Sequence, residues 1–233
     1  MRNWLLILGF LCGLSRCANA PGAPAPDDTP VIPSEVSDFD VLYEQNCAGC
    51  HGSQGKGGAA IALGNPVYLA IADDTVLLRV ATNGITGTSM PAFAQSAGGI
   101  LTDKQIDVIV RGMRNRWSKP GALRGAVPPP YSASEPGVAA RGLEVYGTYC
   151  VSCHGPGGRG GRKAGSIVDG TFLALITDQE LRTIVIAGRP ELGAPDWRGN
   201  AAGRPMSAQD VSDVVAWLAS QRLYSTPTSK AGV

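Results

Sequence analysis

Hydrophobic residues recur every three or four positions in short stretches of the first half of the chain, with polar residues between them. This periodicity predicts helices over residues 38–46 and 73–83, and a longer helix that starts at Thr102 and ends near Trp117. A glycine follows the second helix as a stop signal, and Thr102 with Gln105 forms a capping box for the third. The apolar positions of these helices are Phe39, Leu42, Tyr43, Val76, Leu77, Val80, Ile106, Ile109, Val110 and Met113.

The second half of the chain repeats this pattern. A helix is predicted from Thr177 to Ala187, ended by a glycine as in the first half, and Ser207 begins a final helix. Residues 171–175 match residues 67–71 in their apolar pattern. A period of roughly a hundred residues is too long for a solenoid and indicates duplication of a domain. The apolar positions of the second half include Leu143, Val145, Tyr146, Val211, Val214, Val215 and Leu218.

The segments outside these patterns divide the chain. Residues 21–36 are rich in proline and alanine and predict a flexible leader, and residues 119–137 contain three consecutive prolines and predict a semi-rigid linker. Two domains are therefore expected over residues 37–118 and 138–224, followed by a tail over residues 225–233.

The pattern Cys-x-x-Cys-His occurs once in each half and is typical of c-type haem attachment. Both cysteines lie on one turn, so that their sulfurs can add to the two vinyl groups of one porphyrin, and the histidine offers its imidazole to the iron. A zinc site or a redox dithiol is the alternative, but each copy lacks the second ligand pair of a closed zinc site. The sequence predicts two covalent haems c, attached at Cys47, Cys50, Cys150 and Cys153 and ligated by His51 and His154.

Glycine-rich segments, residues 52–58 and 155–161, follow both motifs. The first is not a phosphate-binding loop, because Lys56 is not followed by Ser or Thr and no strand precedes it. We expect both segments to wrap the haem edge with backbone where side chains would not fit.

Composition and charge limit the classes of function. The 233 residues suffice for two small domains, each with its own core. The net charge of +1 gives no polybasic signal for nucleic-acid binding. The second half has a basic tendency; some of these side chains are expected to neutralise haem propionates and most to lie on the surface: Arg162, Lys163, Arg182, Arg189, Arg198 and Arg204.

Residues 1–20 have the features of an export signal, with a charged start, an apolar run too short to span a membrane, and a small-residue cleavage pattern. Pro21 is unfavourable for the usual signal peptidase, and Cys17 ends a segment that resembles a bacterial lipoprotein box, with Arg16 where a small residue is expected. The alternatives are a soluble exported protein and one tethered to lipid through Cys17. Of six cysteines, Cys12 and Cys17 belong to the signal and the other four to haem, so no structural disulfide is expected.

On the two haem motifs and the repeated helix order, each half resembles a class I bacterial cytochrome c. The whole resembles the two-domain dihaem cytochromes c that carry electrons in the periplasm, over about residues 37–224. The resemblance implies an all-α fold in which the first and last helices of each domain cross near the haem, with a ligand loop before the last helix. It also implies electron transfer and maturation outside the cytoplasm, in the periplasm or on the outer face of the membrane.

Only two histidines exist, and both belong to the attachment motifs, so methionine is the remaining candidate for the far side of each iron. Met90 lies in a Met-Pro-x-Phe setting that resembles the family's ligand loop, and we predict that it ligates haem one. The alternative is a core methionine.

The second half departs from this pattern, because Met90 aligns with Ala194, which cannot bind iron. Met206 is the available methionine in this half, and we predict that it ligates haem two. The alternative is that Met206, which aligns with Leu101, packs on Val211 as a hydrophobic staple. Haem two would then be five-coordinate or bind water.

Three functions follow from these patterns. The leading hypothesis is a dihaem carrier that moves single electrons from a quinol- or substrate-oxidising complex to a terminal oxidase, reaction centre or other cytochrome. The second is a haem enzyme, of peroxidase or small-molecule oxidase type, with an open iron at haem two. The third is a gas- or redox-sensing module, for which the sequence offers no output domain.

Overall fold

The computed structural model describes residues 31–199 and 203–222. The predicted signal peptide over residues 1–20, with Cys17, and the predicted tail over residues 225–233 lie outside these ranges. The chain divides into two compact units, one up to Val36 and one from Ser37 onward. In the first unit, Pro33–Glu35 (η3) form a single turn of 3-10 helix.

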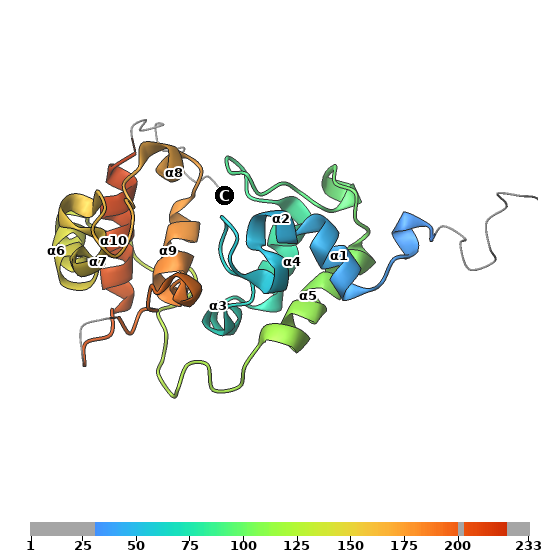
Figure 1. Cartoon of the computed structure of the whole chain (residues 1–233), viewed down its shortest axis with the longest axis horizontal. Helices are drawn as coiled ribbons and strands as arrows, with labels where there is room; N and C mark the ends of the chain where they lie inside the picture. The colour runs from blue at the N-terminus through green and yellow to red at the C-terminus, as the bar shows by residue number, and fades with distance from the viewer. Residues whose placement is uncertain (1–30, 200–202, 223–233) are drawn as a thin grey trace, which may run out of the picture. The chain divides into compact units, whose positions relative to one another are not determined.

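The second unit is helical, and Figure 1 shows its elements in chain order. The first half has α1 (Phe39–Asn46), α2 (Ala48–His51), α3 (Pro66–Ile71), α4 (Asp74–Asn83) and α5 (Asp103–Trp117). The second half has α6 (Ala139–Tyr149), α7 (Val151–His154), α8 (Gly170–Ala174), α9 (Asp178–Ala187) and α10 (Ala208–Ser220). Four further 3-10 turns are η4 (Ser53–Gly55), η5 (Gln95–Ala97), η6 (Pro156–Gly158) and η7 (Pro190–Leu192). Among the described residues β-structure is limited to two isolated bridges, which confirms the all-α class.

The helix ends form as their capping residues predict. The Thr102 capping box at α5 is present, with Gln105 returning a hydrogen bond to the backbone of Thr102. Ser207 caps α10 in the same way. Gly84 and Gly188 end α4 and α9 with φ of 66° and 69°, a region that favours glycine.

The first and last helices of each half pack against each other, α1 with α5 and α6 with α10. A glycine permits each close approach. A Cβ at Gly112 of α5 would lie 2.0 Å from the Phe39 ring, and one at Gly142 of α6 would lie 2.0 Å from the Asp213 carbonyl oxygen. The helix crossing implied by the family resemblance is therefore present in both halves.

On the predicted apolar face of α4, one side chain is fully buried and two are half-buried. Leu77 is buried, but Val76 and Val80 are only half-buried. In α10 the predicted face is complete, since Val211, Val214, Val215 and Leu218 are all buried.

An arginine at the end of each last helix fixes the corner between two earlier ones. Arg114 donates to the carbonyls of Leu69 and Ala72 and pairs with Asp74. Arg222 makes the equivalent set, donating to the carbonyls of Leu173 (2.9 Å) and Ile176 (2.8 Å) and pairing with Asp178 (2.6 Å). The duplication thus extends to individual hydrogen bonds.

The linker after Trp117 lies on α9. The Arg182 side chain donates from Nη2 to the carbonyl of Pro130 (2.9 Å), from Nε to that of Tyr131 (3.1 Å), and from Nη1 to the Ser212 hydroxyl (3.1 Å). Arg182 is only 3% exposed, and burial lowers the pKa of its guanidinium. Arg182 is therefore one of the six basic residues that does not lie on the surface, because its donors satisfy linker carbonyls inside the fold.

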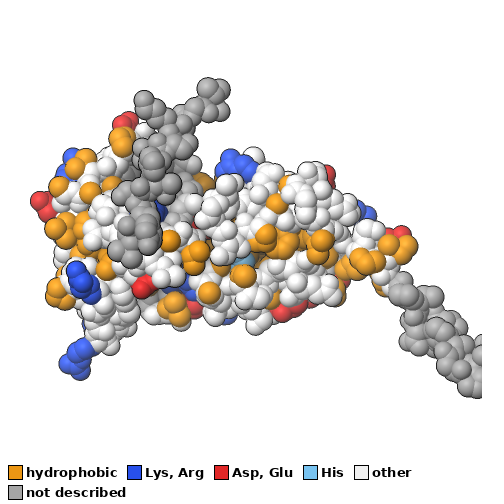
Figure 2. Space-filling model, turned by 90° about the horizontal axis from the view of Figure 1, so that it is seen from above, with side chains coloured by type: hydrophobic (Ala, Val, Ile, Leu, Met, Phe, Trp, Pro, Cys, Tyr) orange, Lys and Arg blue, Asp and Glu red, His pale blue; other side chains and the backbone are white. Residues whose placement is uncertain are grey.

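Charge is dispersed on the face that Figure 2 shows, where cationic and anionic side chains lie among neutral and hydrophobic ones. Within residues 31–199 and 203–222, no helix has the length and apolar character needed to cross a bilayer.

Candidate functional site

The two attachment motifs have the same local structure. Cys47 ends α1 and begins α2, Cys150 ends α6 and begins α7, and both have φ of −118°. The amide of His51 donates to the carbonyl of Cys47 and that of His154 to the carbonyl of Cys150, each at 3.0 Å. Each motif therefore forms one helical turn that presents two thiols followed by an imidazole.

The His51 side chain is oriented as a metal ligand requires. Its Nδ1 lies 2.8 Å from the carbonyl oxygen of Ile61, which can only accept, so Nδ1 carries the hydrogen and Nε2 the lone pair. Nε2 is buried and has no hydrogen-bond partner. Burial lowers the pKa of His51, which favours the neutral imidazole that binds metal. This orphaned nitrogen fits an iron ligand, with Ile61 fixing the ring orientation.

His154 is held in the same way but in a more open setting. Its Nδ1 lies 2.9 Å from the carbonyl oxygen of Gly165. The ring is half-buried, whereas that of His51 is 7% exposed. Both histidines thus have the same tautomer available, which leaves Nε2 as the predicted ligating atom.

The cysteines do not have the properties of a redox dithiol. Burial, aided by the neighbouring cysteine, raises the pKa of Cys47 to about 12 and that of Cys150 to about 11. Reactive dithiol motifs instead lower a thiol pKa. Among the described residues, no group of three or more His, Cys, Asp or Glu side chains is placed to hold a metal ion.

The glycine segments fold back on the attachment motifs. A Cβ at Gly58 would lie 2.2 Å from the Cys50 carbonyl oxygen, and one at Gly161 would lie 2.6 Å from that of Cys153. Glycine is needed here because backbone passes over backbone. The tyrosine before each motif closes the same turn, with Tyr43 donating to Gly52 O (2.9 Å) and Tyr146 to Gly155 O.

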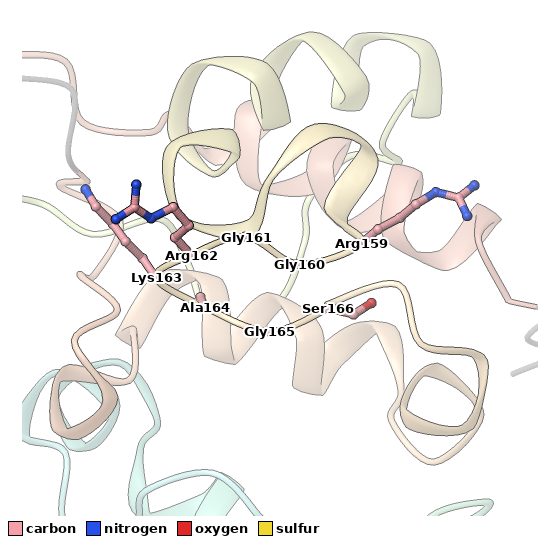
Figure 3. Close-up of a pocket in the computed structure, with 8 residues that line it drawn as sticks. All are labelled: Arg159, Gly160, Gly161, Arg162, Lys163, Ala164, Gly165 and Ser166. Atoms are coloured by element: carbon pink, nitrogen blue, oxygen red, sulfur yellow. The ribbon is translucent and has the colours of Figure 1, made fainter.

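The second glycine segment continues into a basic loop, residues 159–166, which lines an open hollow of about 600 Å³. Figure 3 shows Arg162 and Lys163 side by side and Arg159 at the other end of the loop. Arg162 and Lys163 also line a second hollow with Cys153. After Gly58 the first half has Ala59 and Ala60 instead, so only the second attachment site has this extra positive charge.

The Met90 loop closes on the end of α4. The amide of Ile85 donates to the carbonyl of Met90 (3.0 Å), and the amide of Met90 donates to the Thr88 hydroxyl (3.1 Å). A Cβ at Gly84 would lie 2.6 Å from the Met90 carbonyl oxygen. The Met90 side chain is half-buried.

The second half follows the same backbone path without a methionine. The amide of Arg189 donates to the carbonyl of Ala194 (3.0 Å), and a Cβ at Gly188 would lie 2.5 Å from the Pro195 carbonyl oxygen. Ala194 therefore occupies the position of Met90, as the sequence alignment predicts.

Met206 occupies the position of Leu101. Its amide donates to the Trp197 carbonyl at 2.8 Å, as that of Leu101 donates to the Phe93 carbonyl at 2.8 Å. The two side chains are 6% and 5% exposed. This is the place of a hydrophobic staple before the last helix, and ligation of haem two by Met206 stays a prediction.

Two residues near the sites were missed by sequence reasoning or given only a general role. Asn65 precedes a Pro at the start of α3 and is buried. Arg189, one of the six basic residues expected either at haem propionates or on the surface, is largely buried beside Glu191. The sequence did contain a signal for Asn65. The aligned residue in the second half is Asp169, which can cap a helix but cannot donate a hydrogen bond, so the asparagine adds a donor that capping does not need.

Comparison with known proteins gives a family. The model of the family described as "Cytochrome C oxidase, cbb3-type, subunit III" matches twice, over residues 34–111 and 137–218. The chain is 30% identical over 139 residues to the cbb3-type cytochrome c oxidase subunit CcoP of Azospirillum sp. (strain B510), which covers 55% of this chain and 41% of that protein. It is 28% identical over 169 residues to the cbb3-type cytochrome c oxidase subunit FixP of Sinorhizobium medicae (strain WSM419), which covers 67% of this chain and 52% of that protein.

The chain thus spans about half the length of the curated relatives it matches. A solved structure, the Kuenenia stuttgartiensis reducing HAO-like protein complex Kustc0457/Kustc0458, aligns with 83% of this chain and 100% of that chain at 18% identity and a TM-score of 0.43.

Proposed function

The chain belongs to the family of cytochrome c oxidase, cbb3-type, subunit III, and from that membership we propose that it is an exported carrier of single electrons. Its two matched segments are c-type cytochrome domains with covalently bound haem c. We propose a quinol- or substrate-oxidising complex as electron donor and a terminal oxidase, reaction centre or other cytochrome as acceptor. The relatives are subunits of cbb3-type oxidases, which supports an oxidase-linked role.

One observation carries the proposal: each half presents two thiols and an imidazole on one turn, and the His51 Nε2 is buried without a partner. A buried polar atom without a hydrogen bond costs free energy of about 1–3 kcal/mol, so it is retained where a ligand satisfies it. A bound haem supplies the one-electron chemistry at this position.

The chain's own residues prepare each site for that group. Cys47 and Cys50, with Cys150 and Cys153, provide the sulfurs of the thioether links. The carbonyls of Ile61 and Gly165 hold the imidazoles at fixed orientation through Nδ1. Met90, on its closed loop, offers a thioether sulfur to the first site, and a sulfur ligand raises the reduction potential.

We propose that the protein works in the periplasm or on the outer face of the cytoplasmic membrane. The support is the export signal over residues 1–20 and the chemistry of haem attachment. The lipid tether at Cys17 is the alternative to a soluble form. Mass spectrometry of the exported protein distinguishes them, because acylation adds the mass of the lipid to an amino-terminal Cys17.

Haem content tests the function directly. The protein exported from a host that attaches haem c should carry two haems that stay bound after acid–acetone extraction, and Cys50→Ser and Cys153→Ser should each weaken or abolish one covalent attachment. Each haem should accept and release one electron reversibly. A colourless protein, or loss of both haems from either single variant, would contradict the proposal.

A second candidate function rests on Ala194. With alanine at the Met90 position, haem two would have an open iron unless Met206 ligates it. That arrangement supports a haem enzyme of peroxidase or small-molecule oxidase type. Carbon monoxide distinguishes the two, because a carrier with two methionine ligands leaves both reduced haems largely unchanged and an open iron binds one equivalent.

A further inference from the structure

The two halves meet where α3 of the first half packs against α9 of the second. The end of α9 leads directly into the turn that carries Ala194, and α3 follows the loop that holds the His51 ring. Contacts at this meeting point therefore join the surroundings of one haem site to those of the other.

Asn65 makes the central contact. Its Oδ1 accepts from the amides of Val67 (2.8 Å) and Tyr68 (3.4 Å), which caps α3. Its Nδ2 donates to the carbonyls of Ala187 (2.9 Å) and Gly188 (3.3 Å), which lie at the end of α9. The last carbonyls of a helix lack partners within it, and Asn65 satisfies two of them from the other half. The side chain is 4% exposed, so these bonds are shielded from water.

The second half contains its own control. Asp169 stands at the position of Asn65 and caps α8 by accepting from the amide of Phe172 (2.9 Å) in an exposed setting. An ionised carboxylate accepts but cannot donate. Asp169 thus caps its helix as Asn65 does but makes no donor contact to the other half. The amide donor is present only at Asn65, where the chain contacts the end of α9.

Arg189 makes a second contact across the same boundary. Its Nη2 donates to the carbonyl of Gly58 (3.0 Å), in the glycine segment that covers Cys50. Glu191 pairs with the same guanidinium, and the two side chains are 13% and 14% exposed. Arg189 also forms the backbone bridge to Ala194. The loop of the second half that carries Ala194 is thereby hydrogen-bonded to the glycine segment after the first attachment motif.

We propose that Asn65 and Arg189 are positioning residues that hold the two haem sites at one spacing and orientation, so that electrons pass between the haems at this boundary. The inference rests on the proposed function. Electron transfer between fixed centres falls steeply with their separation, and the protein's contribution is to fix orientation and distance. Each contact joins a backbone carbonyl of one half to a side chain of the other, which leaves little freedom for sliding.

The test compares Asn65→Asp with Asp169→Asn in the dihaem protein. Asn65→Asp keeps the acceptor that caps α3, removes both donors, and places a carboxylate against the Ala187 and Gly188 carbonyls. Flash reduction of one haem, followed by relaxation at wavelengths that separate the two, measures electron exchange between them. We expect exchange to slow by about fivefold in Asn65→Asp, because the rate depends on the separation and orientation that the protein fixes. Asp169→Asn should match the parent.

A purely structural defect would change the haem spectra or the haem content, so both are measured beside the exchange rate. The spectrum of each haem and the haem content should stay unchanged in Asn65→Asp, and Arg189→Gln should slow exchange in the same direction. Exchange at the parent rate in both variants would overturn the inference. A parent protein with fewer than two haems would instead overturn the proposed function, so the two failures are distinguishable.

Discussion

The two halves share a backbone path but differ at the far side of the predicted haem position. In the first half the loop after α4 carries Met90, and in the second the same hydrogen bond to the helix end is made by the carbonyl of Ala194. The attachment turns, the tyrosine contacts and the arginine anchors are kept in both. The elements around the attachment motifs are thus the same in both halves, and the residue at the predicted position of the second axial ligand differs.

Removing the predicted ligand of haem one should have the largest effect on this comparison. Met90→Ala should leave haem one attached but let its reduced iron bind one equivalent of carbon monoxide. The potential should fall by on the order of 100 mV, a fraction of the roughly 0.8 V range that axial ligands control. Redox titration with optical detection measures it. An unchanged spectrum would show that Met90 is a core residue, and Met113→Leu, in the core of α5, serves as control.

Met206 and Leu101 form a matched pair that sharpens the comparison. Met206→Ala should turn haem two high-spin and lower the free energy of unfolding by about 2–5 kcal/mol, as truncation of a buried side chain does. Leu101→Ala should cost similar stability without a spectral change.

Electronic spectra and denaturant titration separate the two roles of Met206. If Met206→Ala loses stability as Leu101→Ala does but keeps the parent spectrum, the methionine is only a hydrophobic staple.

The α6–α10 contact and the α1–α5 contact should differ in how much stability they lose at acidic pH. Asp213 of α10 is buried, and although burial alone would raise its pKa, hydrogen bonds from Arg141, the Val138 amide and Gln209 lower it overall. Its contribution to stability is present above the unfolded pKa and is lost as the pH falls through the lower folded value.

Asp213→Asn should therefore lower the free energy of unfolding at pH 7 by on the order of 1 kcal/mol. The difference from the parent should shrink below about pH 4, near the unperturbed carboxyl pKa. Denaturant titration across pH measures this. Asp40→Asn, at the exposed ion pair of the first crossing, should change little, and a pH-independent loss in Asp213→Asn would contradict the linkage.

The smallest expected effect concerns the basic loop of the second half. Replacing Arg162 and Lys163 by alanine should slow reduction of haem two by an anionic reductant about threefold at low salt, and the difference should vanish at high salt. Stopped-flow reduction, followed at wavelengths that separate the two haems, measures both rates in one experiment. Haem one serves as the internal control, since Ala59 and Ala60 stand at the corresponding place; equal slowing of both haems would show that the loop acts only through net charge.

The sequence predicts helix positions well where capping residues and periodicity agree. Thr102, Ser207, Gly84 and Gly188 mark ends that the structure confirms within a residue. The alignment of Ala194 with Met90 is also confirmed, because both carbonyls accept the same backbone bond. The haem motifs are recognisable because their chemistry is confined to five consecutive residues.

Contacts between distant segments were not predictable in the same way. Asn65 and Arg182 act through carbonyls of residues far away in sequence, and a carbonyl has no signature in the amino-acid code. Periodicity gives the apolar face of a helix but not how deeply each position is buried, and Val76 and Val80 are half-buried where Leu77 is buried.

The hydrogen bonds from Arg182 to the linker move the start of the second half as a separable domain to before Pro130. A fragment starting at residue 138 lacks Pro130 and Tyr131, and would leave a buried guanidinium without two of its acceptors. A fragment that starts at Pro128 retains them. The excisable segment is therefore longer than its helices, and residues that join the halves in sequence belong physically to the later one.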